Sequence, residues 1–279
     1  MKRFSGVTTA LITPFMNNQV DFNSLDQIIT QQLLNHVDGF VVNGTTAESP
    51  TLEPEEVESI YTFVRKKTPA NKKIILGAGS NSTKQTILSA KKAERLGADA
   101  VLVVVPYYNK PTQVGLFQHF KTVADSVDLP LILYNVPSRT ITSLELETIK
   151  KLSQHPNIVG IKEASGNIDF AKKIRQECGS EFLLLSGDDG TYDQFIKVGG
   201  DGVISVASHI IPTQMKNGMI SAHRDLIDQL FCEANPIPVK MALYLLGHIQ
   251  SPELRLPLTT LSTGQVEKLK SIMRITGLI

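Results

Sequence analysis

Lys162 is the residue whose position in the sequence most directly predicts chemistry. It closes the apolar run of residues 158–161, so we expect it on or beside a buried strand. A lysine in such a place loses hydration, which favours the uncharged amine. A free amine can attack a ketone or an aldehyde and form a Schiff base. The alternative interpretation is a lysine that pairs with a carboxylate or extends to the surface.

Tyr134 stands near the end of residues 131–135, the apolar run that precedes that of Lys162. A phenol at that point can hydrogen-bond to a carbinolamine on Lys162 and relay protons. Taken alone, Tyr134 is also compatible with a packed core tyrosine whose hydroxyl is satisfied.

Two further segments offer groups that can bind carboxylates. Thr45 and Thr46 follow the apolar run 39–43 and Gly44, and this turn supplies backbone N–H groups and two hydroxyls. Such a turn suits a small carboxylate, although it can also be a plain strand-to-helix connection. Arg139 can bind a second carboxylate through its planar fork, or it can be an ordinary surface arginine.

Other kinds of site are not indicated. The histidines form no HxH or HExxH pattern, so we expect no metal site. No GxGxxG follows the first apolar run, and no Walker or GxSxG motif is present. The glycines of residues 199–202 precede an apolar run, so we interpret them as a tight turn rather than a phosphate loop.

The elements that must position these residues form a repeating pattern. Short apolar, β-branched runs occupy residues 7–12, 39–43, 73–77, 100–105, 131–135, 158–162, 182–186 and 202–206. Segments with helical spacing lie at 24–34, 54–67, 83–96, 113–126, 144–153, 169–177 and 192–198. Consecutive apolar positions are typical of parallel strands that are covered on both faces.

Two architectures fit this pattern, an open doubly wound sheet and a closed eight-stranded barrel. Eight nearly uniform units favour a (β/α)8 TIM barrel, in which function collects at the carboxyl ends of the strands. After about residue 208 the strands stop, and the rest is punctuated by prolines such as Pro212 and Pro236. We therefore predict a barrel over residues 1–208 and a C-terminal helical domain over 209–279.

Composition excludes several classes of protein. The chain has 279 residues, 42% of them hydrophobic, and its 28 Lys and Arg nearly balance 27 Asp and Glu. No global basic excess predicts binding to nucleic acid or to a membrane surface. The apolar runs are far shorter than the roughly 20 residues of a membrane span. The N-terminus lacks a signal-peptide pattern and the two cysteines stand alone, so we expect reduced thiols in a cytoplasmic protein.

Several linked motifs give the chain a specific resemblance. It carries GTTAES at 44–49, PYYN at 106–109, YNVPSRT at 134–140, GIKEASG at 160–166, SGDD at 186–189, GVIS at 202–205 and NPIPVK at 235–240. These resemble the signatures of the dihydrodipicolinate synthase family, which belongs to the pyruvate-dependent class I aldolases together with N-acetylneuraminate lyase. The resemblance runs from about residue 4 to the C-terminus.

The resemblance implies a Schiff-base lyase that condenses pyruvate with L-aspartate 4-semialdehyde on the diaminopimelate route to lysine. Lys162 matches the Schiff-base lysine, and Tyr134 matches the proton donor and acceptor. Thr45, Thr46 and Tyr108 match the hydroxyl relay and the contacts to the pyruvate carboxylate. By the same resemblance no metal or organic cofactor is needed, because the iminium serves as the electron sink.

The remaining implied roles concern binding and assembly. Gly187 and Ile204 match positions that line the pyruvate pocket, and Arg139 matches the residue that binds the carboxylate of the semialdehyde. In the family the tyrosine at the position of Tyr108 reaches in from a neighbouring subunit, which implies a homodimer or a homotetramer. Two alternatives stay open: another pyruvate-dependent aldolase, acting on N-acetylneuraminate or a 2-keto-3-deoxy sugar acid, and a non-catalytic barrel that binds a keto acid.

The chain departs from the family pattern at one place. Members that are inhibited by lysine carry histidines and a glutamate where this sequence has Pro54, Val57 and Gln85. The loss of an acidic partner removes the counter-charge for the ammonium group of lysine. We therefore predict weak or absent inhibition by lysine.

Overall fold

Eight parallel strands close into a barrel in the computed structural model, which describes residues 3–279. In chain order the strands are β1 (Gly6–Ala10), β4 (Gly39–Val42), β5 (Lys73–Gly77), β6 (Ala100–Val104), β7 (Leu131–Asn135), β8 (Ile158–Glu163), β9 (Leu183–Ser186) and β10 (Gly202–Ser205). Each strand pairs with the next, and β10 pairs with β1 to close the ring. The predicted TIM barrel is confirmed.

The strands are buried on both faces because their side chains alternate between two apolar clusters. Val41, Ile75 and Ile132 belong to the cluster inside the barrel. Their neighbours Phe40 and Ile74 belong to the larger cluster, which the strands share with the surrounding helices. This two-sided burial explains why the strands read as continuous apolar runs rather than as alternating ones.

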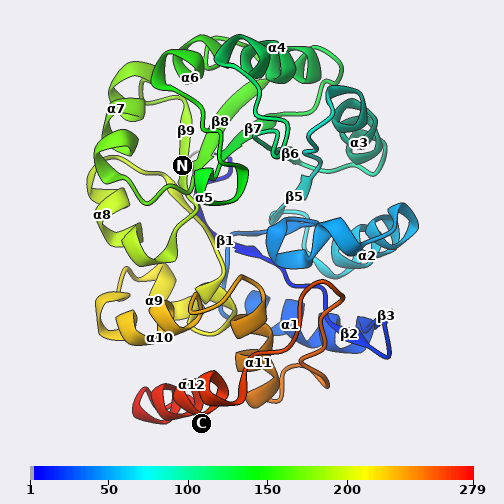
Figure 1. Ribbon diagram of the computed structural model, residues 1–279, viewed down its shortest axis with the longest axis vertical. Coiled ribbons are helices and arrows are strands. Elements are labelled where there is room, and N and C mark those ends of the chain that lie inside the picture. The colour runs from blue at the N-terminus through cyan, green and yellow to red at the C-terminus, as the bar shows by residue number, and fades with distance from the viewer. Residues whose placement is uncertain (1–2) are drawn as a thin grey trace.

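The seven predicted helices are all present, with ends that differ from the prediction by two residues or fewer. They are α1 (Phe22–Leu34), α2 (Pro54–Lys67), α3 (Thr83–Arg95), α4 (Gln113–Ala124), α6 (Leu146–Leu152), α7 (Ile168–Cys178) and α8 (Tyr192–Lys197). Figure 1 shows them as a ring around the strands. Local signals set their ends: Pro54 opens α2 beside a capping box of Glu53 and Glu56, and Asn167 caps α7.

A short hairpin and a short helix were not predicted. The strands β2 (Phe15–Met16) and β3 (Gln19–Val20) form an antiparallel hairpin. Its turn residues Asn17 and Asn18 both have positive φ, 54° and 59°, as a tight hairpin turn requires. The four-residue helix α5 (Pro137–Thr140) starts directly after β7. Both elements are too short to produce a periodic pattern in the sequence.

The C-terminal part is helical, as predicted, but not throughout. It contains α9 (Pro212–Lys216), α10 (Arg224–Gln229), α11 (Ile237–Leu245) and α12 (Thr263–Ile275), and residues 246–262 form no helix or strand. Helix α9 contacts β1, whereas α12 packs against α10 and α11 at the edge of the molecule (Figure 1). The division at residue 208 stays a prediction, and residues 1–2 of the first predicted domain lie outside the described residues.

Two general features complete the description. Within residues 3–279, no helix combines the length and the apolar character that crossing a membrane requires. Cys178 and Cys232 are free thiols, both partly exposed.

Candidate active site

Lys162 and Tyr134 lie side by side inside the barrel. They are register partners on the neighbouring strands β8 and β7, and each is 7% exposed. The Nζ atom of Lys162 lies 4.3 Å from the centre of the Tyr134 ring. Tyr134 belongs to the interior cluster, as does Leu185, the partner of Lys162 on β9. The amine therefore points into the barrel, near the carboxyl ends of the strands.

Gly187 and Ile204 complete the wall around Lys162. Gly187 follows β9, and a Cβ atom there would lie 2.7 Å from Cε of Lys162 and 2.5 Å from Cβ of Ala164. Such distances leave no room for a side chain, so glycine lets the lysine chain pass. Ile204 is a buried residue of β10 and belongs to the same interior cluster as Tyr134. The structure thus brings together four of the predicted site residues.

The two threonines lie beside this group. They sit in the short 3-10 helix η1 (Thr45–Ala47), which begins directly after β4 and Gly44. Thr46 is 3% exposed, and Thr45 is half-buried. A cavity of about 160 Å³ is lined by Thr45 and Tyr134, together with Ser49 and Tyr107. Aliphatic hydroxyls of Thr and Ser and phenolic hydroxyls of Tyr therefore belong to residues that line one cavity.

A buried ion pair anchors the end of the threonine turn. Glu48 ends the turn with positive φ, 57°, and its carboxylate pairs with Nζ of Lys240, whose side chain is fully buried. The second carboxylate oxygen accepts a hydrogen bond from the backbone N–H of Arg255 at 2.9 Å. Burial lowers the pKa of Lys240 to about 8, although Glu48 and Glu253 oppose that shift. The turn is therefore anchored by the part of the chain that follows the barrel.

Asn235 is a site residue that reasoning from single residues missed. It is 8% exposed, and its Nδ2 donates a hydrogen bond to Oγ1 of Thr46 at 2.9 Å. Arg139, an exposed residue of α5, donates from Nη2 to the backbone oxygen of Asn235 at 3.3 Å. The motif at 235–240 was the available signal, because it contains both Asn235 and Lys240.

Tyr108 is the one predicted site residue that the structure keeps away from this cluster. It follows β6, its side chain is 89% exposed and its φ is +74°. A positive φ is uncommon for a bulky residue, so the loop holds this tyrosine in an unfavourable backbone conformation. Of the other predicted residues, Tyr134 and Gly187 contact Lys162, Thr45 shares the cavity with Tyr134, and Asn235 connects Thr46 to Arg139.

Glu163 fixes the strand end that carries Lys162. It points to the outer face of β8, is 2% exposed, and accepts hydrogen bonds from Nδ2 of Asn135 and from the backbone N–H of Ser165, both at 2.7 Å. Burial raises the pKa of Glu163, and these hydrogen bonds oppose the shift. The carboxylate therefore links the ends of β7 and β8 and holds the two loops in register.

The arrangement can support imine chemistry on a small acid. It combines a buried amine, an adjacent phenol, two hydroxyls and an arginine at the rim. Among the described residues, no three His, Cys, Asp or Glu side chains gather as a metal site would require.

Known proteins are similar to this chain in both sequence and fold. Residues 3–276 match the model of the "Dihydrodipicolinate synthetase family". A "4-hydroxy-tetrahydrodipicolinate synthase" of Bdellovibrio bacteriovorus is 54% identical over 293 residues, covering 100% of both chains. A crystal structure of the dihydrodipicolinate synthase of Thermotoga maritima has a TM-score of 0.96 and 41% identity, covering 100% of both chains. The enzyme of Acinetobacter baumannii complexed with pyruvate has a TM-score of 0.94 and 39% identity, covering 99% of both chains.

Proposed function

The chain belongs to the dihydrodipicolinate synthetase family, and on that premise we propose how its residues condense pyruvate with L-aspartate 4-semialdehyde. The protein is a lyase with the barrel of that family, and its reaction is that of 4-hydroxy-tetrahydrodipicolinate synthase. The observation that carries the residue assignment is the placement of the buried Lys162 amine against the Tyr134 ring, at 4.3 Å.

Lys162 forms the covalent intermediate in this proposal. Its amine attacks the ketone carbon of pyruvate, and the carbinolamine loses water to give an iminium. Loss of a methyl proton converts the iminium into an enamine, whose carbon attacks the aldehyde of the second substrate. The amine of that substrate then displaces Lys162 from the imine carbon and closes the ring. One water leaves overall, and the lysine returns to its starting state.

Tyr134 and the threonines move the protons that these steps require. The ring of Tyr134 lies beside the amine. We assign to its hydroxyl the transfer of a proton to the departing hydroxyl and the acceptance of one from the methyl group. Thr46 and Thr45 bind the pyruvate carboxylate and pass protons onward. Gly187 and Ile204 line the pocket around the lysine chain.

Arg139 selects the second substrate. Its guanidinium lies at the rim beside Asn235 and binds the carboxylate of the semialdehyde through two parallel N–H donors. A sugar-acid aldolase has no use for a carboxylate fork at this point, so this residue favours the semialdehyde over N-acetylneuraminate or a 2-keto-3-deoxy sugar acid. The intact Lys162 and Tyr134 likewise favour an enzyme over a non-catalytic keto-acid-binding barrel.

The proposed active unit is a homodimer or a homotetramer. Tyr108 is exposed and strained in the single chain, and both facts are explained if its side chain enters the relay of a neighbouring subunit. We propose that the reaction needs no metal or organic cofactor, because the iminium on Lys162 withdraws the electrons. The free thiols agree with a reducing cytoplasm.

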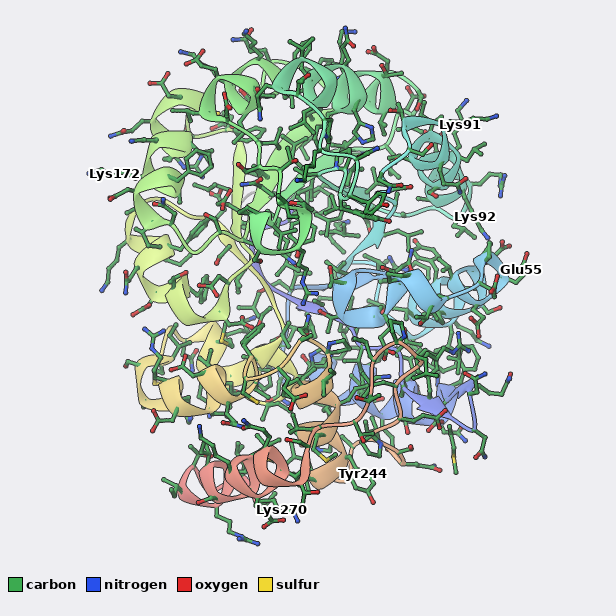
Figure 2. The ribbon with its side chains drawn as sticks, viewed as in Figure 1. Glu55, Lys91, Lys92, Lys172, Tyr244 and Lys270 are labelled. Carbon is green, nitrogen blue, oxygen red and sulfur yellow. The ribbon has the colours of Figure 1, made fainter. Side chains whose placement is uncertain are left out.

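Borohydride trapping tests the Schiff base directly. The protein is reduced in the presence of pyruvate, and the adduct is located by peptide mass spectrometry. We expect one reduced pyruvyl group on Lys162 and none in Lys162→Ala. Lys172→Ala is the matched control, because Lys172 projects from the outer surface of α7 (Figure 2) and its loss should leave the adduct intact. Wild-type protein without an adduct, or an adduct that survives Lys162→Ala, contradicts the proposal.

A substrate panel then tests the choice of aldehyde. Enzyme that has not been treated with borohydride should turn over pyruvate with L-aspartate 4-semialdehyde and should not cleave N-acetylneuraminate. Turnover with the sugar acid instead would replace the proposed substrate while keeping the Schiff base.

A further inference from the structure

We propose that Asn235 is a positioning residue that sets the direction in which the Thr46 hydroxyl donates its hydrogen bond. The inference rests on the proposed role of Thr46 in contacting pyruvate and passing protons. It concerns a residue of the region after the barrel, and it adds a function to that region beyond packing.

The hydrogen-bond geometry carries the first step. Nδ2 of Asn235 lies 2.9 Å from Oγ1 of Thr46, and an amide nitrogen can only donate. The hydroxyl oxygen is therefore the acceptor, and its own hydrogen has to point elsewhere. Among the described residues, Thr46 has no other hydrogen-bond partner for its side chain. Among the described residues this hydrogen therefore has no protein acceptor, and the proposal assigns it to the pyruvate carboxylate.

The second step comes from the other end of the same amide. Oδ1 of Asn235 is buried and has no hydrogen-bond partner within residues 3–279. An unpaired buried acceptor destabilises a folded protein, so packing and stability alone do not favour an amide here. A buried polar atom without a hydrogen-bond partner departs from the usual pattern of folded proteins, and such departures commonly occur at functional sites. The N–H group that reaches Thr46 is the feature that explains the amide.

The third step is the location of Asn235 between the two substrate positions. Its side chain holds Thr46, which contacts pyruvate in the proposal, and its backbone oxygen accepts a hydrogen bond from Arg139 at 3.3 Å. Asn235 thus contacts both Thr46, assigned to pyruvate, and Arg139, assigned to the semialdehyde. A wrongly directed Thr46 hydroxyl would present lone pairs, rather than a hydrogen, to the pyruvate carboxylate.

A double-mutant cycle tests whether Asn235 acts through the Thr46 hydroxyl. Thr46→Val removes the hydroxyl and keeps the shape, and Asn235→Leu removes the amide. The measured rate is the exchange of pyruvate methyl protons into D2O, which requires the Schiff base and the relay but no second substrate. We expect Asn235→Leu to lower this rate by about 10-fold in the wild type and by less than about 2-fold in Thr46→Val. An equal loss in both backgrounds overturns the proposal.

Asn235→Asp tests the direction. An ionised carboxylate can only accept, so it turns the Thr46 hydroxyl toward itself, and we expect a loss at least as large as that of Asn235→Leu. Retention of most of the rate would show that the amide serves as an acceptor and would overturn the proposal. If the aspartate variant fails to fold, the cycle with leucine still decides.

Asn157→Leu is the matched control. Its Nδ2 donates to the backbone oxygens of Ala124 and Val127, at the opposite end of the barrel. We expect this variant to lower the melting temperature while leaving the exchange rate unchanged. Borohydride trapping of each variant with pyruvate separates the two proposals. If the wild-type protein forms no pyruvate adduct and exchanges no methyl protons, the Schiff-base function is refuted. If it does both, but the effects of Asn235→Leu and Thr46→Val are additive, only the role of Asn235 is refuted.

Discussion

At the scale of single residues, Gly187 shows how the absence of a side chain supports a reactive one. A Cβ at this position would lie 2.5 Å from Cβ of Ala164 and 2.7 Å from Cε of Lys162. Real Cβ atoms do not approach so closely, so even alanine would displace the lysine chain from the Tyr134 ring. A displacement of about 1 Å at a reacting group can cost about 100-fold in rate.

Gly187→Ala should therefore lower kcat/KM for pyruvate by about 100-fold, and the close approach to Cβ of Ala164 should also lower the melting temperature. Steady-state kinetics and a thermal melt measure the two effects. Gly264→Ala is the control, since no heavy atom lies within 4 Å of a Cβ there. A Gly187→Ala enzyme with wild-type kcat/KM would show that the lysine chain has more freedom than the structure gives it.

Three residues of α2 and α3 predict the response to lysine. Pro54 opens α2, Val57 is half-buried, and Gln85 lies in the first turn of α3, so none of these positions supplies an anionic or imidazole partner. Initial rates at millimolar lysine should match those without lysine. Gln85→Glu restores a carboxylate and should increase sensitivity. Strong inhibition of the wild-type enzyme would contradict this prediction.

At the scale of elements, the turn η1 depends on the helix α11. Lys240 of α11 pairs with Glu48 in a region without solvent, and its Nζ also donates to the backbone oxygen of Glu253 at 2.9 Å. Removal of one partner from a buried pair leaves the other charge uncompensated, which typically costs 3–5 kcal/mol. The pair therefore connects the stability of the molecule to the position of Thr46.

Lys240→Met should destabilise the protein by about 3 kcal/mol, as measured by urea unfolding, and Glu48→Gln in the same chain should recover most of that loss. Lys121→Met breaks the exposed pair with Asp125 and should leave the urea midpoint unchanged. If the double variant is no more stable than Lys240→Met, the cost does not arise from the unpaired Glu48 carboxylate.

The elements also show what the sequence could and could not predict. Strands and long helices were predicted because apolar runs and helical periodicity are local patterns, and Pro54 and Asn167 mark helix starts by local chemistry. The hairpin at Asn17 and Asn18 was not predicted, because strands of only two residues each produce no periodic pattern in the sequence.

The site was predicted in unequal parts. Once the barrel was inferred, the ends of two neighbouring strands placed Lys162 beside Tyr134, and Figure 1 shows β7 and β8 adjacent. The contacts of Asn235 with Thr46 and of Lys240 with Glu48 join segments about 190 residues apart. No local pattern encodes such pairs, so only the family motif at 235–240 pointed to them.

At the scale of the whole molecule, Tyr108 predicts that active sites are shared between subunits. Co-expressed Lys162→Ala and Tyr108→Phe chains pair at random in a dimer. Half of the dimers are then mixed, and each mixed dimer has one site with both residues intact. We expect about a quarter of the wild-type activity, although each variant alone is nearly inactive.

Separately purified homodimers of the two variants provide the control for this experiment, since they should show no activity before their subunits exchange. If the mixed preparation stays as inactive as its parents, Tyr108 does not work in a neighbouring site. A monomeric wild type in sedimentation velocity would contradict the shared site as well.

The contacts of the last quarter of the chain with the threonine turn have a consequence for synthesis on the ribosome. Asn235, Lys240 and Arg255 all reach back to residues 46–56, which were translated long before them. A nascent chain can complete its eight strands and still lack the groups that orient Thr46 and Glu48. Catalytic competence is therefore acquired late in translation, so an incomplete chain with a formed barrel has little capacity to turn over pyruvate.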